Sequence, residues 1–313
     1  MRIYSLDGGG VKGASEGRIT QRLEAAHPFL ADVDLFAGTS TGGILALALA
    51  ANVPLDDCVA FYRDHSSRIF GARDVLDRIS GVDEYFRANY SQDVLRELLV
   101  GVFGDMRLPD LEREVLLPTF DLTRFRPKFL DRSDDWSCVD AALATSAAPT
   151  YLPVHVVREN FAGHVNGEGA VRAMVDGGVF ANNPADRAIG FAQTKLGVSL
   201  EEISLFSLGA GAPPLAPLEE LLAEGKKALD WGIRQWLVKK PHLLLKVLFD
   251  GSVSASHFAA RGMLGARYHR LQPVLSEDVD LAAYEKIPML LAAADQIDLD
   301  AELEWLKFNW SPK

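Results

Sequence analysis

Short apolar runs and longer segments of helical period follow one another along the start of the chain. Residues 2–6 and 33–37 are apolar runs with the length of buried strands. Residues 14–26 carry apolar side chains at helical spacing, and residues 43–51 form a longer apolar run that predicts a buried helix. The order strand–loop–helix–strand–turn–helix predicts parallel strands with helices on the faces of the sheet.

The same criteria predict further elements of both kinds as far as residue 208. Helices are expected over 55–70, 91–100, 137–145 and about 184–195, and strands over 116–121, 128–130, 173–175 and 203–208. The charged, irregular residues 71–90 are interpreted as a surface insertion. Three prolines lie in 212–218, and the chain then becomes helical and amphipathic. We therefore expect one α/β core over residues 1–211, with a helical extension over 212–313 packed on it.

The turn between residues 33–37 and 43–51 contains the first candidate for chemistry. Residues 38–42 have the sequence Gly-Thr-Ser-Thr-Gly, and this strand–turn–helix context is typical of a nucleophile elbow. The flanking positions of so tight a turn must be nearly free of side chains. The turn would present the Ser40 hydroxyl in a cleft at a helix N-terminus, where developing negative charge is favoured. The alternative is a glycine-rich turn in which Ser40 only caps the helix.

A glycine-rich loop follows the first predicted strand. Residues 7–13 have the sequence Asp-Gly-Gly-Gly-Val-Lys-Gly, whose backbone N–H groups can converge on a phosphate or on the oxyanion of an acyl intermediate. Residues 8–13 also match G-x-G-x-x-G, with Asp34 at about the distance of a ribose-binding acid, so a dinucleotide or phosphate site is the alternative. Against the dinucleotide, Asp34 lies inside the second predicted strand. The sequence also lacks the Lys-Ser/Thr ending of a P-loop.

A third feature is Asp176, which ends a predicted strand and precedes Gly177 and Gly178. A serine hydroxyl needs a base to become a nucleophile. Histidine is the usual base, but none of the seven histidines lies in a recognisable sequence motif. This holds also for His257 and His269, which lie late in the chain. The sequence therefore favours Asp176 as the partner of Ser40.

Composition limits the class of protein. With 313 residues, 48% of them hydrophobic, the chain can bury a large α/β core, and its formal charge of −11 argues against nucleic-acid binding. Cys58 and Cys138 match no metal or redox spacing and are expected to be small buried side chains. No cofactor or metal is expected. The absence of a signal-peptide pattern and of a long apolar stretch predicts a cytoplasmic protein.

One basic stretch stands out in this acidic chain. Residues 223–249 hold six Lys or Arg against two Asp or Glu. The tryptophans, cations and leucines of 231–249 fit peripheral contact with a membrane. The alternative is a pair of core helices with the apolar stems of lysine side chains along their edges. Apolar stripes belong to a core more often than to a membrane interface.

Together these motifs resemble the patatin-like phospholipase family over about residues 1–211. The resemblance rests on five segments in family order: 7–13, 38–42, 144–149, 176–184 and 207–211. Two positions depart from the family pattern, since Lys12 stands where Arg is common and Ala210 where Thr is usual. The resemblance implies a three-layer α/β/α sandwich with a mostly parallel central sheet.

The resemblance also implies a function, calcium-independent hydrolysis of carboxylic esters in phospholipids or related acyl lipids. Ser40 would be the nucleophile and Asp176 its base, without a histidine, and Gly8, Gly9 and Gly10 would donate N–H groups to the oxyanion. The alternatives from other classes are a nucleotide- or phosphate-binding domain and a lipid-binding protein with a defunct site.

Overall fold

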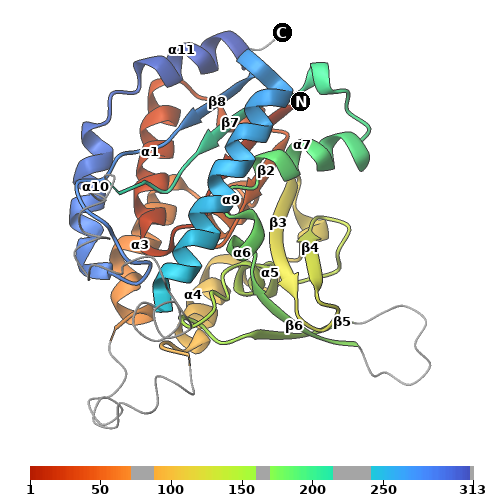
Figure 1. Ribbon diagram of the computed structural model, residues 1–313, viewed down its shortest axis with the longest axis vertical. Helices are drawn as coiled ribbons and strands as arrows, with labels where there is room; N and C mark the ends of the chain where they lie inside the picture. Colours follow the sequence, from red (N-terminus) through yellow and green to blue (C-terminus); the bar gives the residue numbers. More distant parts are fainter. Residues whose placement is uncertain (72–87, 160–169, 214–240, 311–313) are drawn as a thin grey trace, which may run out of the picture.

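The computed structural model describes residues 1–71, 88–159, 170–213 and 241–310. Its strands form a single sheet in the order β5-β6-β3-β2-β1-β7-β8, with β4 beside β3 (Figure 1). The strands are β1 (Arg2–Leu6), β2 (Leu35–Gly38), β3 (Glu114–Asp121), β4 (Arg126–Leu130), β5 (His155–Glu159), β6 (Ala170–Asp176), β7 (Ser204–Leu208) and β8 (Tyr268–Leu271). The run β3-β2-β1-β7-β8 is parallel, whereas β4, β5 and β6 pair antiparallel.

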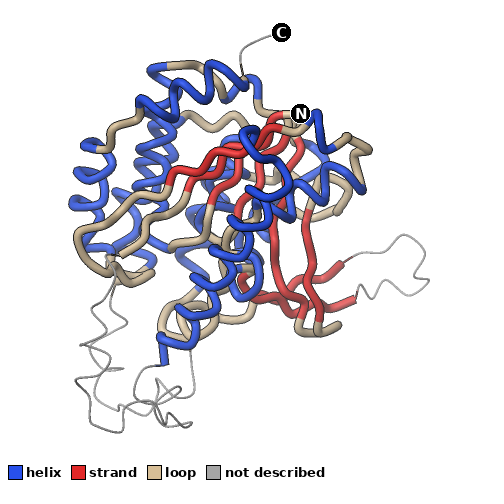
Figure 2. Tube along the Cα trace, turned by 45° about the horizontal axis from the view of Figure 1, so that its top comes forward, coloured by secondary structure: helices blue, strands red, loops and turns tan. Residues whose placement is uncertain are grey.

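Helices cover both faces of this sheet (Figure 2). They are α1 (Gly13–Ala26), α2 (Thr41–Ala50), α3 (Leu55–Ile69), α4 (Gln92–Phe103), α5 (Cys138–Thr145), α6 (Gly178–Ala181), α7 (Ala185–Thr194), α9 (Pro241–Leu264), α10 (Ile287–Gln296) and α11 (Asp300–Asn309). None of the helices in the described ranges is long and apolar enough to cross a membrane.

Alternation along the central strands divides the core into two layers. Tyr4, Phe36 and Phe206 pack into the cluster shared with α1, α2 and α10, whereas their neighbours Ile3, Leu35 and Leu205 pack into the cluster with α7 and α9. Side chains that alternate in this way are buried on both faces of a sheet. The expected three-layer α/β/α arrangement with a mostly parallel sheet is therefore confirmed.

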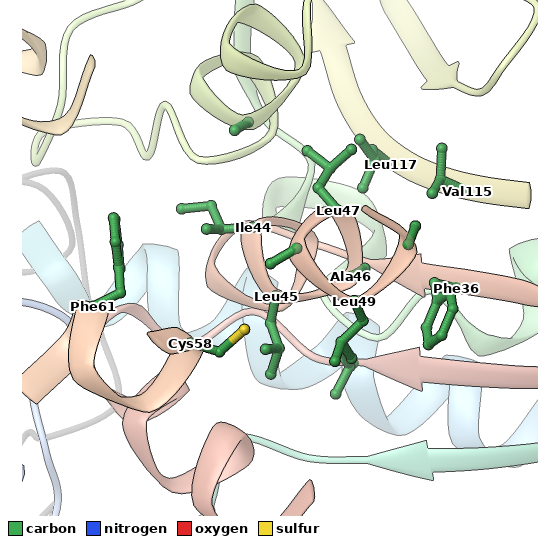
Figure 3. Close-up of a cluster of buried hydrophobic side chains, with 14 of the residues drawn as sticks. Phe36, Ile44, Leu45, Ala46, Leu47, Leu49, Cys58, Phe61, Val115 and Leu117 are labelled. Atoms are coloured by element: carbon green, nitrogen blue, oxygen red, sulfur yellow. The ribbon is translucent and has the colours of Figure 1, made fainter. Parts of the chain in front are cut away.

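Helix α2 is buried on every side. All ten of its residues are buried, and Figure 3 shows its leucines projecting toward neighbouring elements around the helix. A helix that is apolar all round belongs in a core. This burial fixes the position of the turn that precedes α2.

Two strands were missing from the sequence prediction. Strand β5 lies in the turn-rich stretch after Pro153, and β8 lies in the extension expected to be helical. β8 is only four residues long and contains His269 and Arg270, so it lacks a clear period; it forms because the free edge of β7 accepts it in parallel. The region 212–313 thus extends the central sheet as well as adding helices. Most of the predicted insertion, and residues 223–240 of the basic stretch, lie outside the described residues.

Candidate active site

The glycine loop and the elbow meet because β1 and β2 are parallel neighbours that end at the same edge of the sheet. Residue 7 follows β1, and Gly38 ends β2. Strand β6 runs antiparallel to β3 and ends with Asp176 opposite Thr119. Three segments far apart in sequence therefore converge at the carboxyl ends of the central strands, where α/β folds place their sites.

The elbow holds Ser40 in a backbone conformation that is rare for a side-chain-bearing residue. Its φ is 56° and its ψ is −123°. A Cβ at Gly38 would lie 2.1 Å from the carbonyl oxygen of Gly42, and one at Gly42 would lie 2.3 Å from that of Asp7. The expected need for side-chain-free flanking positions is confirmed. Non-glycine residues persist in such conformations where their surroundings enforce them, often at functional sites.

Ser40 occupies the N-cap position of α2, but its side chain makes no capping hydrogen bond. Its hydroxyl instead lies within interaction range of the Asp176 carboxyl group, whose pKa it lowers. The backbone N–H of Ser40 donates to Thr145 Oγ1 at 3.1 Å, and that hydroxyl donates to the carbonyl of Pro118 at 2.7 Å. Thr145 thus ties the elbow to α5 and β3 and leaves the serine hydroxyl to Asp176.

Asp176 is buried, with only 1% of its surface exposed. Its Oδ1 accepts the N–H of Gly178 at 2.7 Å, and its own N–H donates to the carbonyl of Ala147 at 3.0 Å. Burial raises the pKa of the Asp176 carboxyl from 3.8 to about 7, against the opposing effect of the hydrogen bonds from Gly178 and Ser40. A carboxyl group with a pKa near neutrality is suited to general base catalysis.

The three glycines of the loop have different surroundings. The N–H of Gly8 donates to the carbonyl of Asn182 at 2.9 Å, and Asn182 Nδ2 donates back to the carbonyl of Gly8 at 3.1 Å. Gly10 has a φ of +58° and lies against the carbonyl of Leu281. The N–H of Gly8 is thus already paired, which differs from the expectation that all three would be available. Those of Gly9 and Gly10 have no acceptor within the described parts of the chain.

A buried ion pair lies beneath this loop. Arg270 of β8 donates to both carboxyl oxygens of Asp7, at 3.1 and 2.5 Å, and to Ser207 Oγ at 2.7 Å. The side chains of Arg270 and Asp7 are 6% and 2% exposed. The two-pronged geometry fixes the orientation of the carboxylate that precedes the glycines. Sequence reasoning missed Arg270, because it lies in a short strand 263 positions from its partner.

The two departures from the family pattern lie beside Gly9. A Cβ there would be 2.4 Å from the Cβ of Ala210 and 3.3 Å from that of Lys12. Burial lowers the pKa of the Lys12 ammonium, which the carboxylates of Asp250 and Asp278 partly oppose.

Three histidines in the described residues form hydrogen bonds away from the serine. His155 pairs with Asp140 and Gln92, His257 with Tyr268, and His269 with Glu302. His164 lies outside the described residues. Cys58 and Cys138 are buried free thiols, and in the described ranges no three His, Cys, Asp or Glu side chains are grouped as metal ligands would be.

Asp34 does not support the dinucleotide alternative. It precedes β2, and its Oδ2 accepts the N–H of Arg2 at 2.6 Å, at the opposite end of the strands from the glycine loop. A ribose-binding acid belongs at the carboxyl end of its strand, beside the loop.

Fold and site together define an α/β protein that carries a serine on a nucleophile elbow. Residues 4–189 match the family described as Patatin-like phospholipase, and the chain belongs to this family. It is 31% identical over 279 residues to Patatin-like protein 2 of Oryza sativa subsp. indica. This alignment covers 76% of this chain and 66% of the rice protein. The chain thus spans about two thirds of that relative's length.

Two further comparisons extend over more of the chain. A cGAMP-activated phospholipase of Pseudomonas aeruginosa (strain BWHPSA011 / Pa011) is 27% identical over 298 residues, 91% of this chain and 82% of that protein. The structure of human GIVD cytosolic phospholipase A2 aligns with this chain at 12% identity and a TM-score of 0.43. The alignment covers 99% of this chain and 62% of the phospholipase A2 chain.

Proposed function

We propose that the chain is a serine acyl hydrolase that cleaves carboxylic ester bonds of phospholipids or related acyl lipids. The observation that carries the proposal is the placement of the Ser40 hydroxyl beside the buried Asp176 carboxyl. Gly10 and Ser40 also line one apolar pocket, which gives an ester carbonyl a place beside both. Family membership and the name of the Pseudomonas relative support a phospholipid as the substrate.

In the first half of the reaction, Asp176 takes the proton of Ser40 while Ser40 Oγ attacks the ester carbonyl carbon. The oxyanion that forms accepts hydrogen bonds from the open N–H groups of Gly9 and Gly10, where Gly8 and Asn182 hold the loop in place. The alcohol part of the lipid then leaves with the proton held by Asp176, and an acyl-enzyme remains.

In the second half, Asp176 takes a proton from a water molecule, which attacks the acyl carbonyl. The carbonyl–Oγ bond breaks, the proton returns to Ser40, and a fatty acid is released. An aspartate with a pKa of about 7 is charged often enough near neutrality to act as the base and still able to return the proton.

Release of fatty acid from phosphatidylcholine vesicles tests the proposal. We expect release with the wild-type chain and with Ser67→Ala, an exposed serine on α3, and none above background with Ser40→Ala. Equal release by Ser40→Ala and Ser67→Ala would refute the role of the elbow. Matching circular dichroism spectra of the two variants would show that both fold.

We also propose that the described end of the basic stretch contacts the membrane. Val247 and Leu248 of α9 are 50% and 42% exposed and follow Lys246, a combination that suits an interface between lipid and water. Co-sedimentation with anionic vesicles should fall for Val247→Glu/Leu248→Glu and stay unchanged for Phe308→Glu, which alters an exposed residue of α11. Undiminished binding of the α9 variant would overturn this contact.

A further inference from the structure

The pocket that contains Ser40 has a polar end and an apolar remainder. Gly10, Ser40 and Thr41 form the polar end. Beyond them the lining is mostly apolar and comes from α3, α4 and the segments around residues 151 and 281: Ile69, Phe70, Leu95, Tyr151, Leu152 and Leu281. We call this space the serine pocket. Its volume is only about 50 Å³, which leaves room for a carbonyl group and a few further atoms.

A second and much larger cavity lies between α2, α3 and α4, and we call it the helix cavity. Its volume is about 620 Å³, within the range of pockets that hold small-molecule ligands. Its walls are mainly apolar and include Leu45 and Ala48 of α2, Ala60 of α3, and Leu98 and Val102 of α4. Charged side chains are few in the lining, and Asp57 and Glu97 among them carry negative charge that repels a phosphate group.

Three residues line both cavities: Ile44, Phe61 and Tyr62. Tyr62 is fixed, because its hydroxyl accepts a hydrogen bond from Thr41 Oγ1 at 2.8 Å and donates one to the Thr41 carbonyl at 3.0 Å. The side chains of Ile44 and Phe61 have no such anchor. Figure 3 shows Ile44 extending from α2 toward the part of α3 that carries Phe61. These two apolar side chains form the partition between the cavities.

We infer that the helix cavity holds the acyl chain of the substrate. The ester carbonyl lies at Ser40, the first methylenes occupy the serine pocket, and the rest of the chain passes Ile44 and Phe61. The inference rests on the proposed function and deepens it, because it assigns long, unbranched acyl chains as the preferred substrates. The small serine pocket cannot hold such a chain alone, whereas the adjoining cavity offers the apolar surface that methylenes prefer.

This arrangement predicts how the rate depends on chain length. Each methylene that moves from water to an apolar wall is expected to raise kcat/KM about fourfold. The series p-nitrophenyl butyrate, octanoate and dodecanoate should therefore show a steep rise. A side chain that fills the helix cavity should stop the increase of kcat/KM at a shorter acyl chain. It should leave kcat/KM for the butyrate unchanged.

Position 101 has room for the first atom of a side chain beside the helix cavity. Gly101 of α4 lines the helix cavity, and a Cβ built on it meets no atom within 4 Å. Gly101→Phe is therefore the first variant. Val102→Trp is the second, since Val102 lines the same cavity and is 37% exposed. Gly190→Phe on α7 is the matched control, because its Cβ also meets nothing within 4 Å and it lines neither cavity.

We expect the butyrate rate to be the same in all four proteins. If a filling side chain displaces two methylenes, kcat/KM for the dodecanoate falls about fifteenfold in Gly101→Phe and Val102→Trp, but not in Gly190→Phe. If the two filling variants keep the wild-type dependence on chain length while cleaving all three esters, the inference is wrong and the proposed function stands. A wild-type chain that cleaves no ester refutes the proposed function, and the inference fails with it. Should Gly101→Phe not fold, Val102→Trp alone decides.

Discussion

Replacing Asp176 by asparagine is expected to stabilise the folded chain near neutral pH while it removes the proposed base. Asparagine has nearly the same shape, its Oδ1 can accept the N–H of Gly178, and its amide group can donate to Ser40. The change therefore mainly removes a buried titrating group. Burial raises the pKa of the Asp176 carboxyl from 3.8 to about 7, so the folded chain holds this proton more tightly than the unfolded chain.

The sign and size of the effect follow from that difference. The unfolded chain loses the proton near pH 4 and the folded chain only near pH 7, so the stabilisation that the proton provides is complete below about pH 4 and is lost by about pH 7. Each pH unit between these values lowers the free energy of unfolding by about 1.4 kcal/mol. Over about three pH units the free energy of unfolding of the wild-type chain falls by about 4 kcal/mol, and this fall does not occur in Asp176→Asn.

Urea unfolding of both proteins at several pH values measures this loss directly. Near pH 4 their free energies of unfolding should differ by less than about 1 kcal/mol, and at about pH 8 the variant should be more stable by about 4 kcal/mol. All other titrating groups are common to the two proteins and cancel in the comparison. If the free energies of unfolding differ by the same amount at both pH values, the claim that burial raises the pKa of Asp176 to about 7 is refuted.

Further predictions concern the rate and the supports of the site. For ester cleavage, kcat/KM should rise with pH to a plateau above about 7, because Asp176 acts when ionised; a flat profile between pH 5 and 8 would contradict this. Arg270→Met leaves the buried Asp7 carboxylate unpaired and should lower the free energy of unfolding by about 3 kcal/mol or more, whereas adding Asp7→Asn should restore part of it; urea titrations that show no recovery would refute the pairing. Thr145→Val removes the acceptor of the Ser40 N–H and should destabilise the chain by about 1–3 kcal/mol, whereas Thr145→Ser should stay close to wild type in the same titration.

The sequence was sufficient for the parts of the site that depend on local geometry. A turn flanked by glycines at 38 and 42, between a buried strand and a buried helix, permits few structures, because a Cβ at either position would clash with backbone atoms. Asp176 was predicted because it ends a strand and is followed by two glycines. Helix and strand periods placed most of the remaining elements within a few residues of their observed ends.

Contacts that depend on the tertiary structure left no such local pattern. Gly8 pairs with Asn182 through one backbone hydrogen bond and one from the Asn182 side chain, and no local pattern indicates this contact because the two residues lie 174 positions apart. Arg270 resembles any surface arginine in sequence until β8 joins the edge of β7 and brings it beneath the glycine loop. The cavity between α2, α3 and α4 likewise exists only once three helices pack with a gap between them.

The central claim is that Asp176 activates Ser40, and the rate and position of labelling by a fluorophosphonate test it most directly. After reaction at about pH 8, peptide mapping by mass spectrometry should find the phosphonyl group on Ser40 alone, and Asp176→Asn should react at least about a hundredfold more slowly. A label on another serine, or equal rates for the wild type and Asp176→Asn, would contradict the claim.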